Sequence, residues 1–425
     1  MAKEYYERIC DQILDEKLSA KGAVLLKGAK WCGKTTTAAH VAKSVLYMED
    51  PAKKRQYLEL ADMNPSQLLQ GEVPRLIDEW QLAPKLWDAV RFEVDQRDDF
   101  GQFILTGSAV PPDISEISHT GTGRIAQLTM RPMTLFESGD SDGSVSLRAL
   151  FSGERDLSGT DDHSLDDIAY LICRGGWPKG IGRSRKIALA QAPDYYEAVV
   201  ESDISRVDQV ERDPIRARRV LRAYARSVSS EATIASILND VRTDPGDTFS
   251  ENTLRTYLSA FRKLFVIEDV PAWNPNLRSR TAIRSSDTRY LVDPSIAAAA
   301  LGIGPGDLIN DLSTAGLLFE NMCVRDLRVY AESIGGGIYH YRDKSNLECD
   351  SVIHLQNGRY GLIEIKLGGD KLIEEGAQNL LKLRERIDTG KMREPAFMMV
   401  LCGIAPFAYR RSDDVLVVPI GCLRN

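Results

Sequence analysis

The chain has 425 residues, of which 43% are hydrophobic and 27% charged, and its 54 basic and 61 acidic residues give a formal net charge of −7. These values predict two to four globular domains and exclude fibrous, collagenous and disordered proteins. Because the chain is acidic, any nucleic-acid surface must be a local patch. It has no run of 18 apolar residues, its start is polar, and its seven cysteines are scattered, so we expect a cytoplasmic protein with reduced thiols and no membrane partner.

The first third of the chain alternates short apolar runs with helical patterns, which predicts an α/β sheet with helices on both faces. The expected strands are residues 22–27, 56–60, 75–79, 103–108 and 125–130, and the expected helices include 34–47 and 84–97. A segment rich in Gly, Ser and Asp follows at 137–167, and we expect a solvated loop there.

A phosphate-binding motif follows the first apolar run. The sequence GAKWCGKTT fits the pattern G-x-x-x-x-G-K-[ST], in which glycines let backbone N–H groups surround phosphate at the start of a helix. Lys34 would reach the β- and γ-phosphates, and the Thr35 hydroxyl would bind Mg²⁺. The motif therefore predicts ATP and Mg²⁺ as cofactors, with the nucleotide held by Gly28, Ala29, Lys30, Trp31, Cys32, Gly33, Lys34, Thr35 and Thr36.

Two adjacent acids end the apolar run RLIDE. In a P-loop ATPase the first, Asp78, would hold Mg²⁺, and the second, Glu79, would orient and deprotonate the attacking water. Thr106, at the end of the next strand, could sense the γ-phosphate or position that water, as could Ser108. An acidic pair on the third strand along the chain favours an ATPase over a small nucleotide kinase.

In the transition state, an arginine usually stabilises the negative charge on the transferred phosphate, and the candidates for this role are Arg124 and Arg131. Either could act across the subunit interface of a homo-oligomer. Either could instead form a structural ion pair.

Several segments together resemble a family of bacterial and archaeal AAA-type P-loop ATPases: GAVLLKGAKWCGKTT, LIDEWQLAP, FILTGSA, GRIAQLTMRPMTLFE, RGGWP (174–178) and GLLFENMCVRDL (316–327). Members of that family carry a winged-helix segment and a C-terminal restriction-endonuclease-like domain of the PD-(D/E)XK type. The resemblance implies an ATPase core at 1–165, a helical lid or linker at 166–228, a winged-helix domain at 229–300 and an α/β nuclease-like domain at 301–425.

A second acidic site is expected in the sequence ECDSVIHLQNGRYGLIEIKL (348–367), which reads as a β-hairpin. Metal-dependent nucleases need carboxylates that hold Mg²⁺ and a lysine that positions water. Asp350 and Glu364, with Glu320 from the preceding helix, would hold the metal. Glu364 and Lys366 would act in catalysis. Ordinary salt bridges on an exposed hairpin face are the alternative.

The hairpin register decides whether these acids meet. A two-residue turn would put Asp350 and Glu364 on opposite faces, whereas a three-residue loop with Gly358 left-handed would pair Asp350 with Glu364. The apolar residues select the second register, because only it places all five on one buried face: Ile353, Leu355, Ile363, Ile365 and Leu367.

Basic residues in the middle of the chain predict DNA as a partner. Arg218, Arg222 and Arg226 share one helical face, residues 250–264 are typical of a recognition helix after a shorter helix at 232–240, and 274–289 is typical of a wing. Further arginines in these segments are Arg212, Arg216, Arg219, Arg255, Arg262, Arg278, Arg280, Arg284 and Arg289. Arginine suits phosphate contact, but such a stripe can also pair with acids elsewhere in the protein.

The favoured interpretation is an ATP-hydrolysing protein that controls a nuclease-like, nucleic-acid-contacting domain. Two alternatives remain open. One is an ATP-dependent switch or protein-interaction module with an inactive nuclease fold, and the other is a winged-helix DNA-binding regulator that uses ATP only as a ligand.

Overall fold

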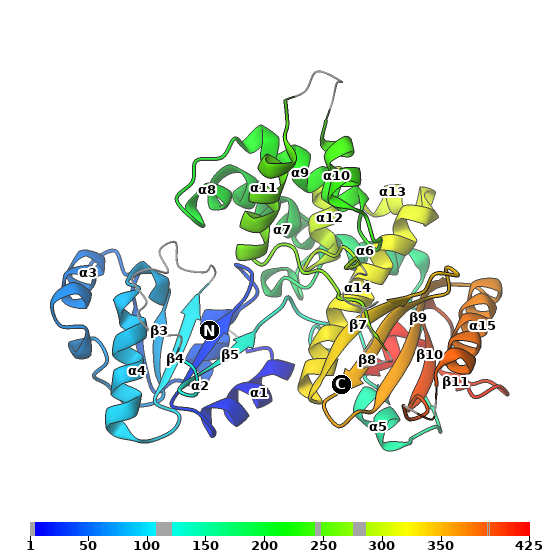
Figure 1. Ribbon diagram of the computed structural model, residues 1–425, viewed down its shortest axis with the longest axis horizontal. Coiled ribbons are helices and arrows are strands. Elements are labelled where there is room, and N and C mark those ends of the chain that lie inside the picture. The colour runs from blue at the N-terminus through cyan, green and yellow to red at the C-terminus, as the bar shows by residue number, and fades with distance from the viewer. Residues whose placement is uncertain (1–4, 108–120, 243–247, 275–285, 389, 391) are drawn as a thin grey trace. The chain divides into compact units, whose positions relative to one another are not determined.

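The computed structural model describes residues 5–107, 121–242, 248–274, 286–388, 390 and 392–425 (Figure 1). The chain divides into two compact units, each described below by itself. Unit 1 comprises Met1–Pro132, Val199–Asp213 and Ser259–Val266, and unit 2 comprises Met133–Ala198, Pro214–Leu258 and Ile267–Asn425. Residues 133–165, which we expected in the ATPase core, therefore group with unit 2.

Unit 1 is built on a parallel sheet of five strands in the order β2-β3-β4-β1-β5. The strands are β1 (Ala23–Lys27), β2 (Ser44–Tyr47), β3 (Arg75–Asp78), β4 (Phe103–Gly107) and β5 (Ile125–Thr129). Because β4 lies between β1 and β3, Lys27 pairs with Gly107 and Asp78 pairs with Thr106. The phosphate-binding loop, the acidic pair and Thr106 thus share one edge of the sheet.

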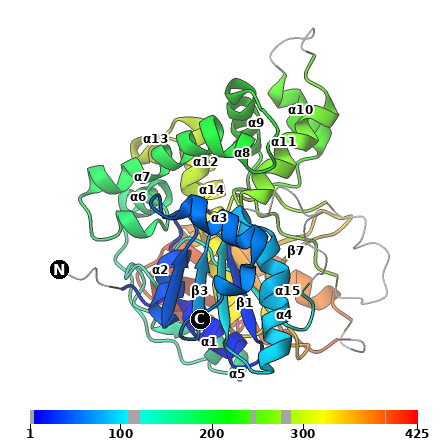
Figure 2. The same ribbon diagram turned by 90° about the vertical axis from the view of Figure 1, so that its left-hand side faces the viewer.

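Helices cover both faces of this sheet, which explains why β1 is apolar throughout. Ala23 and Leu25 face α3 (Lys54–Met63) and α4 (Lys85–Arg97), whereas Val24 and Leu26 face α1 (Ile9–Leu18) and α2 (Lys34–Val41). Figures 1 and 2 show α4 on one side of the strands and α1 and α2 on the other. Further helical elements among the described residues of this unit are the 3-10 turns Pro65–Gln67 and Trp80–Leu82, the π-helical turn Val199–Asp203, α8 (Ile204–Arg206) and the end of α11 (Glu251–Lys263).

The second strand lies elsewhere than we expected. Residues 56–60 form part of α3, and the strand is β2, at the end of the segment expected to be helical. In α3, Tyr57, Leu60 and Ala61 follow helical spacing and pack on the sheet core. A short apolar run fits either element, so the prediction of a strand there was wrong.

Unit 2 contains a six-stranded mixed sheet in the order β11-β12-β10-β9-β8-β7. Its strands are β7 (Gly336–Arg342), β8 (Glu348–Leu355), β9 (Tyr360–Gly368), β10 (Phe397–Ile404), β11 (Tyr409–Arg410) and β12 (Leu416–Pro419). Ile373, Ala377 and Leu380 of α15 (Asp370–Arg386) pack against Val352 and Leu362. Figure 1 shows α14 (Leu312–Ser333) on the other side of this sheet.

The middle of the chain is helical: α6 (Leu165–Arg174), the 3-10 turn Pro178–Gly180, α7 (Arg185–Ala198), α9 (Pro214–Arg226), α10 (Ile234–Val241), α11 (Glu251–Lys263), α12 (Pro294–Leu301) and α13 (Pro305–Asn310). The helices expected at 232–240 and 250–264 are present as α10 and α11. Antiparallel bridges join Ile267 to Leu291 and Val270 to Thr288, on either side of the expected wing. Arg278, Arg280 and Arg284 lie outside the described residues.

The prediction of a solvated loop at 137–167 holds for residues 153–164, which form no helix or strand and are exposed or partly exposed, but it was wrong for residues 145–152. The segment contains β6 (Val145–Ser146) and α5 (Leu147–Ser152), and β6 pairs with β13 (Leu423–Arg424) after the 3-10 turn Ile420–Cys422. Leu147, Leu150 and Phe151 are buried, and the Ser146 hydroxyl caps α5. This short capped helix is difficult to recognise among so many Gly and Asp residues.

The RGGWP segment contributes to the core of unit 2. The Gly176 N–H donates to Asp293 at 2.9 Å, and the Trp177 indole N–H donates to Ser295 at 2.9 Å. Asp293 also accepts from the fully buried Arg325 at 2.9 Å. Two of the segments that carry the family resemblance are thereby joined through one aspartate, which indicates a structural role for both.

Two further observations concern the composition. Within the described parts of the chain, no helix is both long and apolar enough to cross a bilayer. All seven cysteines are described and buried, and no disulfide joins them.

Candidate nucleotide and metal sites

The phosphate-binding loop connects β1 to α2. Gly28 has φ 149°, and a Cβ atom added there would lie 2.0 Å from the carbonyl oxygen of Met130, so only glycine fits. Gly33 (φ 108°) directly precedes α2, and Lys34, Thr35 and Thr36 form the first turn of that helix. Ala29 and Cys32 are buried, while Lys30 and Trp31 are partly exposed. The loop backbone therefore surrounds the positive end of a helix, as a phosphate site requires.

The ammonium group of Lys34 lies inside this loop. It donates to the carbonyl oxygens of Gly28 at 2.9 Å and Ala29 at 2.7 Å. Lys34 is buried, and its flexible stem allows the charge to move from these carbonyl groups to an entering phosphate.

Asp78 connects the loop to two strands. One carboxylate oxygen, Oδ1, accepts a hydrogen bond from the Thr35 hydroxyl at 2.8 Å and from the Thr106 hydroxyl at 2.5 Å. Hydroxyl and carboxylate oxygens are the ligands that Mg²⁺ prefers, so this donor set fits the metal. Ser108, the other polar residue expected here, lies outside the described residues.

Glu79 has an unusual backbone conformation for a residue with a side chain. Its φ is 57°, in the left-handed region, where strain in a non-glycine residue often accompanies a functional role. Its carboxylate accepts a hydrogen bond from the Gln81 amide. Burial raises the pKa of Glu79 and Asp78 adds to the effect, while the charge of Lys34 opposes it. A carboxylate with a raised pKa is a better proton acceptor for catalysis.

The structure does not place Arg124 at this site. Arg124 directly precedes β5, and its carbonyl oxygen accepts from the N–H of Ala23 at the start of β1. It therefore lies at the edge of the sheet opposite the phosphate-binding loop, where its guanidinium pairs with Asp95 at 2.8 Å. Arg124 therefore cannot contact a nucleotide bound by the same chain, and a role for it there is excluded. The sequence did not reveal this, because nothing in it shows which end of β5 lies beside the phosphate-binding loop. Arg131 follows β5 at the edge that carries the loop.

Two residues near the loop escaped the sequence analysis. The buried Arg8 donates to the carbonyl oxygens of Cys32 and Arg131, each at 2.9 Å. Lys30 of the loop pairs with Asp203 at 2.6 Å. Neither Arg8 nor Asp203 belongs to a motif, and Asp203 is 173 residues from its partner, so no local signal could have identified them.

The hairpin in unit 2 has the register that the apolar residues predicted. Ser351 pairs with Ile363 and His354 pairs with Tyr360. The loop closes with the Leu355 N–H donating to Arg359 at 2.8 Å and the Gly358 N–H donating to Leu355 at 3.0 Å. Gly358 has φ 80°, so the three-residue loop with a left-handed glycine is confirmed.

The acids converge where regular pairing of β8 with β9 ends. Beyond Ser351, the Asp350 carboxylate accepts from the backbone N–H of Ile365 at 2.7 Å. The Lys366 ammonium lies 3.2 Å from Asp350 and 2.6 Å from Glu364. The even-numbered face is buried under α15, because it also carries Val352 and Leu362, so the alternative of an exposed hairpin face is not what the structure shows.

The electrostatics of these three groups follow from their burial. Glu364 is 1% exposed, and among the described residues its Oε1 atom finds no hydrogen-bond partner. Burial raises the pKa of Glu364, and the charge of Asp350 raises it further, while Lys366 opposes both. Burial would lower the pKa of Lys366, but the two carboxylates outweigh it and hold that pKa above its usual value. Because its pKa is raised, Glu364 takes a proton more readily than an exposed glutamate does.

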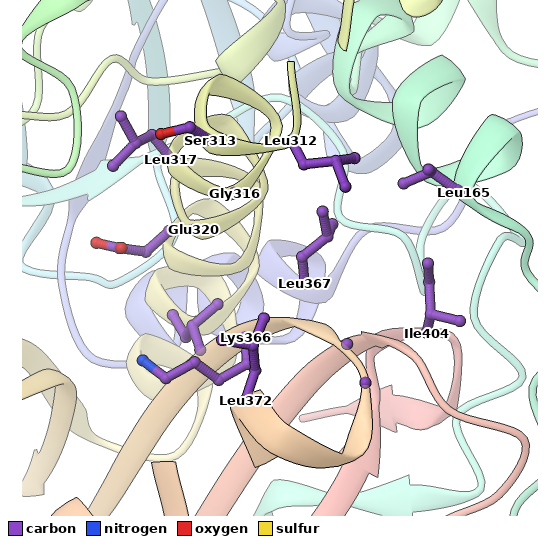
Figure 3. Close-up of a pocket in the computed structure, with 13 residues that line it drawn as sticks. Leu165, Leu312, Ser313, Gly316, Leu317, Glu320, Lys366, Leu367, Leu372 and Ile404 are labelled. Carbon is purple, nitrogen blue, oxygen red and sulfur yellow. The ribbon is translucent and has the colours of Figure 1, made fainter. Parts of the chain in front are cut away.

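Glu320, the third expected metal ligand, extends from α14. Its carboxylate accepts from the hydroxyl of Tyr290, a residue that the sequence analysis missed, and burial together with Asp350 raises the pKa of Glu320. Figure 3 shows the polar ends of Glu320 and Lys366 on the same side. Nowhere in the described chain do three acidic, His or Cys side chains gather as a metal site. The three-carboxylate cluster of Asp350, Glu364 and Glu320 was therefore wrongly predicted, because Lys366 occupies the centre.

Many of the arginines expected on a DNA-binding surface pair with acids instead. Arg212 pairs with Asp208 at 2.6 Å and Arg218 with Glu197 at 2.6 Å. The same holds for Arg226 with Asp240, Arg255 with Glu251, and Arg289 with Asp269. For these five arginines the structure therefore shows ion pairs within the protein, which was the alternative to a DNA-binding surface.

Comparisons with known families agree with the geometry of unit 1. Residues 20–138 match a family model described as an AAA domain. Residues 165–307 and 315–423 match two models that are each described as a domain of unknown function, DUF8612 and DUF4143. Residues 20–138, which contain the phosphate-binding loop and the five-stranded parallel sheet, are thus similar to an AAA domain.

Similar proteins include two from mycobacteria, the uncharacterized proteins Rv2008c of Mycobacterium tuberculosis and Mb2031c of Mycobacterium bovis. Each is 26% identical over 353 residues, which cover 81% of this chain and 70% of the relative. Among solved structures, the Walker-type ATPase PABY2304 of Pyrococcus abyssi matches with 15% identity and a TM-score of 0.41, over 70% of this chain and 97% of that one.

Proposed function

We propose that this protein binds ATP and Mg²⁺ at the phosphate-binding loop of unit 1 and hydrolyses the γ-phosphate. The observation that carries the proposal is the position of Asp78, whose Oδ1 atom accepts from both Thr35 and Thr106. These contacts support the proposal because they hold the Asp78 carboxylate beside the start of α2, with Glu79 as the next residue.

Each side chain has a distinct task in this proposal. Lys34 leaves the Gly28 and Ala29 carbonyl oxygens and contacts the β- and γ-phosphates. Thr35 and Asp78 would hold Mg²⁺, which when bound supplies positive charge next to the phosphates. Glu79 accepts the proton of the attacking water, and Thr106 keeps Asp78 oriented.

Paired variants test these roles by separate measurements of nucleotide binding and phosphate release. Lys34→Ala is expected to abolish ATP binding, because the phosphates lose their cation, and the exposed Lys43→Ala is the matched control. Glu79→Gln is expected to bind ATP but to stall hydrolysis, with the surface variant Glu59→Gln as its control. If Glu79→Gln hydrolyses ATP at the wild-type rate, the assignment of the base is wrong.

A second function is favoured by Glu364 in unit 2. This carboxylate is buried and lies 2.6 Å from Lys366, and one of its oxygens has no hydrogen-bond partner in the described parts of the chain. For Asp350 and Glu364 to hold Mg²⁺, Glu364 would give up its proton and the Lys366 ammonium would move from between the two carboxylates. We propose that this nuclease-like site hydrolyses a phosphodiester bond, with Lys366 positioning the water, and that the nucleotide state of unit 1 controls it.

Cleavage of plasmid and branched DNA with Mg²⁺, with and without ATP, tests the second function. Glu364→Ala should abolish cleavage and leave ATP hydrolysis unchanged, and the exposed Glu374→Ala is the control. If Glu364→Ala cleaves as well as the wild type, the nuclease-like site is inactive and the docking alternative is favoured. Sequence-specific footprints without cleavage would favour the DNA-binding regulator.

A further inference from the structure

A cavity of about 450 Å³ lies in unit 2 next to the acidic hairpin, and Lys366 and Glu320 belong to its lining. Its walls come from α14, from the end of β9 and from the first turn of α15 (Figure 3). They are mainly aliphatic: Leu165, Leu312, Leu317, Leu367, Leu372 and Ile404. The cavity thus connects an apolar wall to the site where phosphodiester hydrolysis is proposed.

Three of these leucines are unusually exposed. Leu312, Leu317 and Leu372 are 53%, 39% and 40% exposed, although each is a large apolar residue next to a concave surface. Exposed apolar side chains gathered around a cavity are typical of ligand sites, which have apolar walls and a few polar groups that fix the orientation of the ligand.

The polar groups lie at the edges of the cavity. Figure 3 shows that the Lys366 ammonium and the Glu320 carboxylate both point away from Leu165 and Ile404. Gly368 and Gly369 contribute backbone atoms without side chains to the lining. Gly369 directly precedes α15, and the amino-terminal end of that helix carries a partial positive charge. An occupant would therefore have an apolar body, and its polar edge would lie beside Lys366 and Glu320.

We propose that the cavity receives one unpaired nucleobase of a nucleic-acid strand whose phosphate lies at Asp350, Glu364 and Lys366. This inference rests on the second proposed function and names its substrate class, a single-stranded or locally unpaired nucleic acid. A volume of about 450 Å³ lies within the range of pockets for small ligands and holds one nucleotide. A base stacked in a duplex cannot enter such a cavity unless it leaves the stack.

Binding of a single-stranded oligonucleotide that contains 2-aminopurine and cleavage-resistant phosphorothioate linkages, in the presence of Mg²⁺, tests the proposal. In the Leu312→Gln/Leu372→Gln variant two amide groups would make the wall of the cavity polar without adding charge. Because both leucines are partly exposed, the fold should persist. We expect at least a tenfold loss of affinity for the single strand, loss of the 2-aminopurine fluorescence change, and no change for the matching duplex. Ile187→Gln, at a 53% exposed position in α7, should bind like the wild type.

Equal affinity of the double variant and the wild type for the single strand would overturn the proposal, as would an equal loss for the single strand and the duplex. A change in self-association without a change in oligonucleotide affinity would also overturn it, because the cavity would then be a protein contact. The proposed nuclease activity is tested by a different result. If the single strand binds as expected but its unmodified form is not cleaved in Mg²⁺, the proposal that the cavity binds a nucleobase is supported and the proposed nuclease activity is contradicted.

Discussion

The Thr35 hydroxyl donates to Asp78 over 2.8 Å, which joins the first turn of α2 to a strand 43 residues further along the chain. Thr106 donates to the same carboxylate oxygen from the neighbouring strand. One oxygen atom therefore aligns three separate segments at the carboxyl edge of the sheet. The metal, the phosphates and the attacking water are all expected at this edge.

The first prediction concerns this carboxylate. Asp78→Asn keeps the shape and one acceptor oxygen but removes the negative charge that would bind Mg²⁺. We expect ATP hydrolysis to fall about 100-fold, the upper range for disturbing the support of a bound metal. Thr35→Ser keeps a hydroxyl and should stay near the wild-type rate. Phosphate release at several Mg²⁺ concentrations checks both, and wild-type kinetics for Asp78→Asn would contradict the metal assignment.

The second prediction compares two Gly→Ala substitutions, one at which the added methyl group would collide with a neighbouring atom and one at which only the backbone conformation is unfavourable. Gly28 and Gly123 both have positive φ, but an added Cβ would lie 2.0 Å from the Met130 carbonyl oxygen at Gly28, whereas at Gly123 it meets nothing within 4 Å. Gly28→Ala should therefore lose ATP affinity, while Gly123→Ala should pay only backbone strain of about 1 kcal/mol. Calorimetric titration with ATP measures the difference, and similar affinities would show that the loop tolerates the side chain.

The third prediction concerns the expected wing. Replacing Arg278, Arg280 and Arg284 by Ala should flatten the dependence of DNA affinity on salt, by about 0.9 in the log–log slope for each lost phosphate contact. The control replaces Arg218, Arg226 and Arg255, which pair with acids within the protein. Binding isotherms between 50 and 200 mM salt give the slopes. An unchanged slope in the first triple variant would show that this segment does not contact DNA.

The fourth prediction is a pH dependence of stability in unit 2. The hydrogen bond to Asp161 raises the pKa of His163 above its usual 6.5, and Asp161 in turn accepts from the Gly421 N–H at 3.0 Å. The folded state thus holds the His163 proton more tightly than the unfolded state. The resulting stability is fully present below about pH 6.5 and is lost as pH rises through the folded pKa.

His163→Gln should therefore flatten the fall in stability above pH 6.5, by up to about 1 kcal/mol, the range of a partly exposed pair. Urea unfolding of both proteins from pH 5.5 to 8.5 provides the comparison. Parallel curves for the wild type and the variant would mean that this pair contributes nothing to the pH dependence.

Features that a short segment encodes were predictable from the sequence. The phosphate-binding loop needs glycines, a lysine and a threonine within nine residues, its strand lies where we expected, and its helix begins where we expected but ends at Val41. The hairpin register could be derived because the parity of five apolar residues and the left-handed Gly358 both allow only one pairing.

Features that depend on distant contacts were not predictable in the same way. Nothing near Arg124 in the sequence tells which end of β5 carries the nucleotide, and nothing near Lys366 shows that its ammonium would take the centre of an acidic cluster. The roles of Glu79, Thr106 and Lys366 in catalysis stay predictions. The function of the middle segment also stays a prediction, because the expected wing lies outside the described residues.

The pairing of β6 with β13 has a consequence for how the protein is made. The parallel sheet of unit 1 has all its strands once Thr129 has been synthesised, whereas Ser141 hydrogen-bonds to Leu423, 282 residues further along the chain. During translation the nucleotide-binding sheet can fold while the ribosome is still working, but unit 2 must wait for β13 to emerge. A ribosome that stalls before β13 would release a chain able to bind ATP, with its second site unfinished and its apolar surfaces available to chaperones.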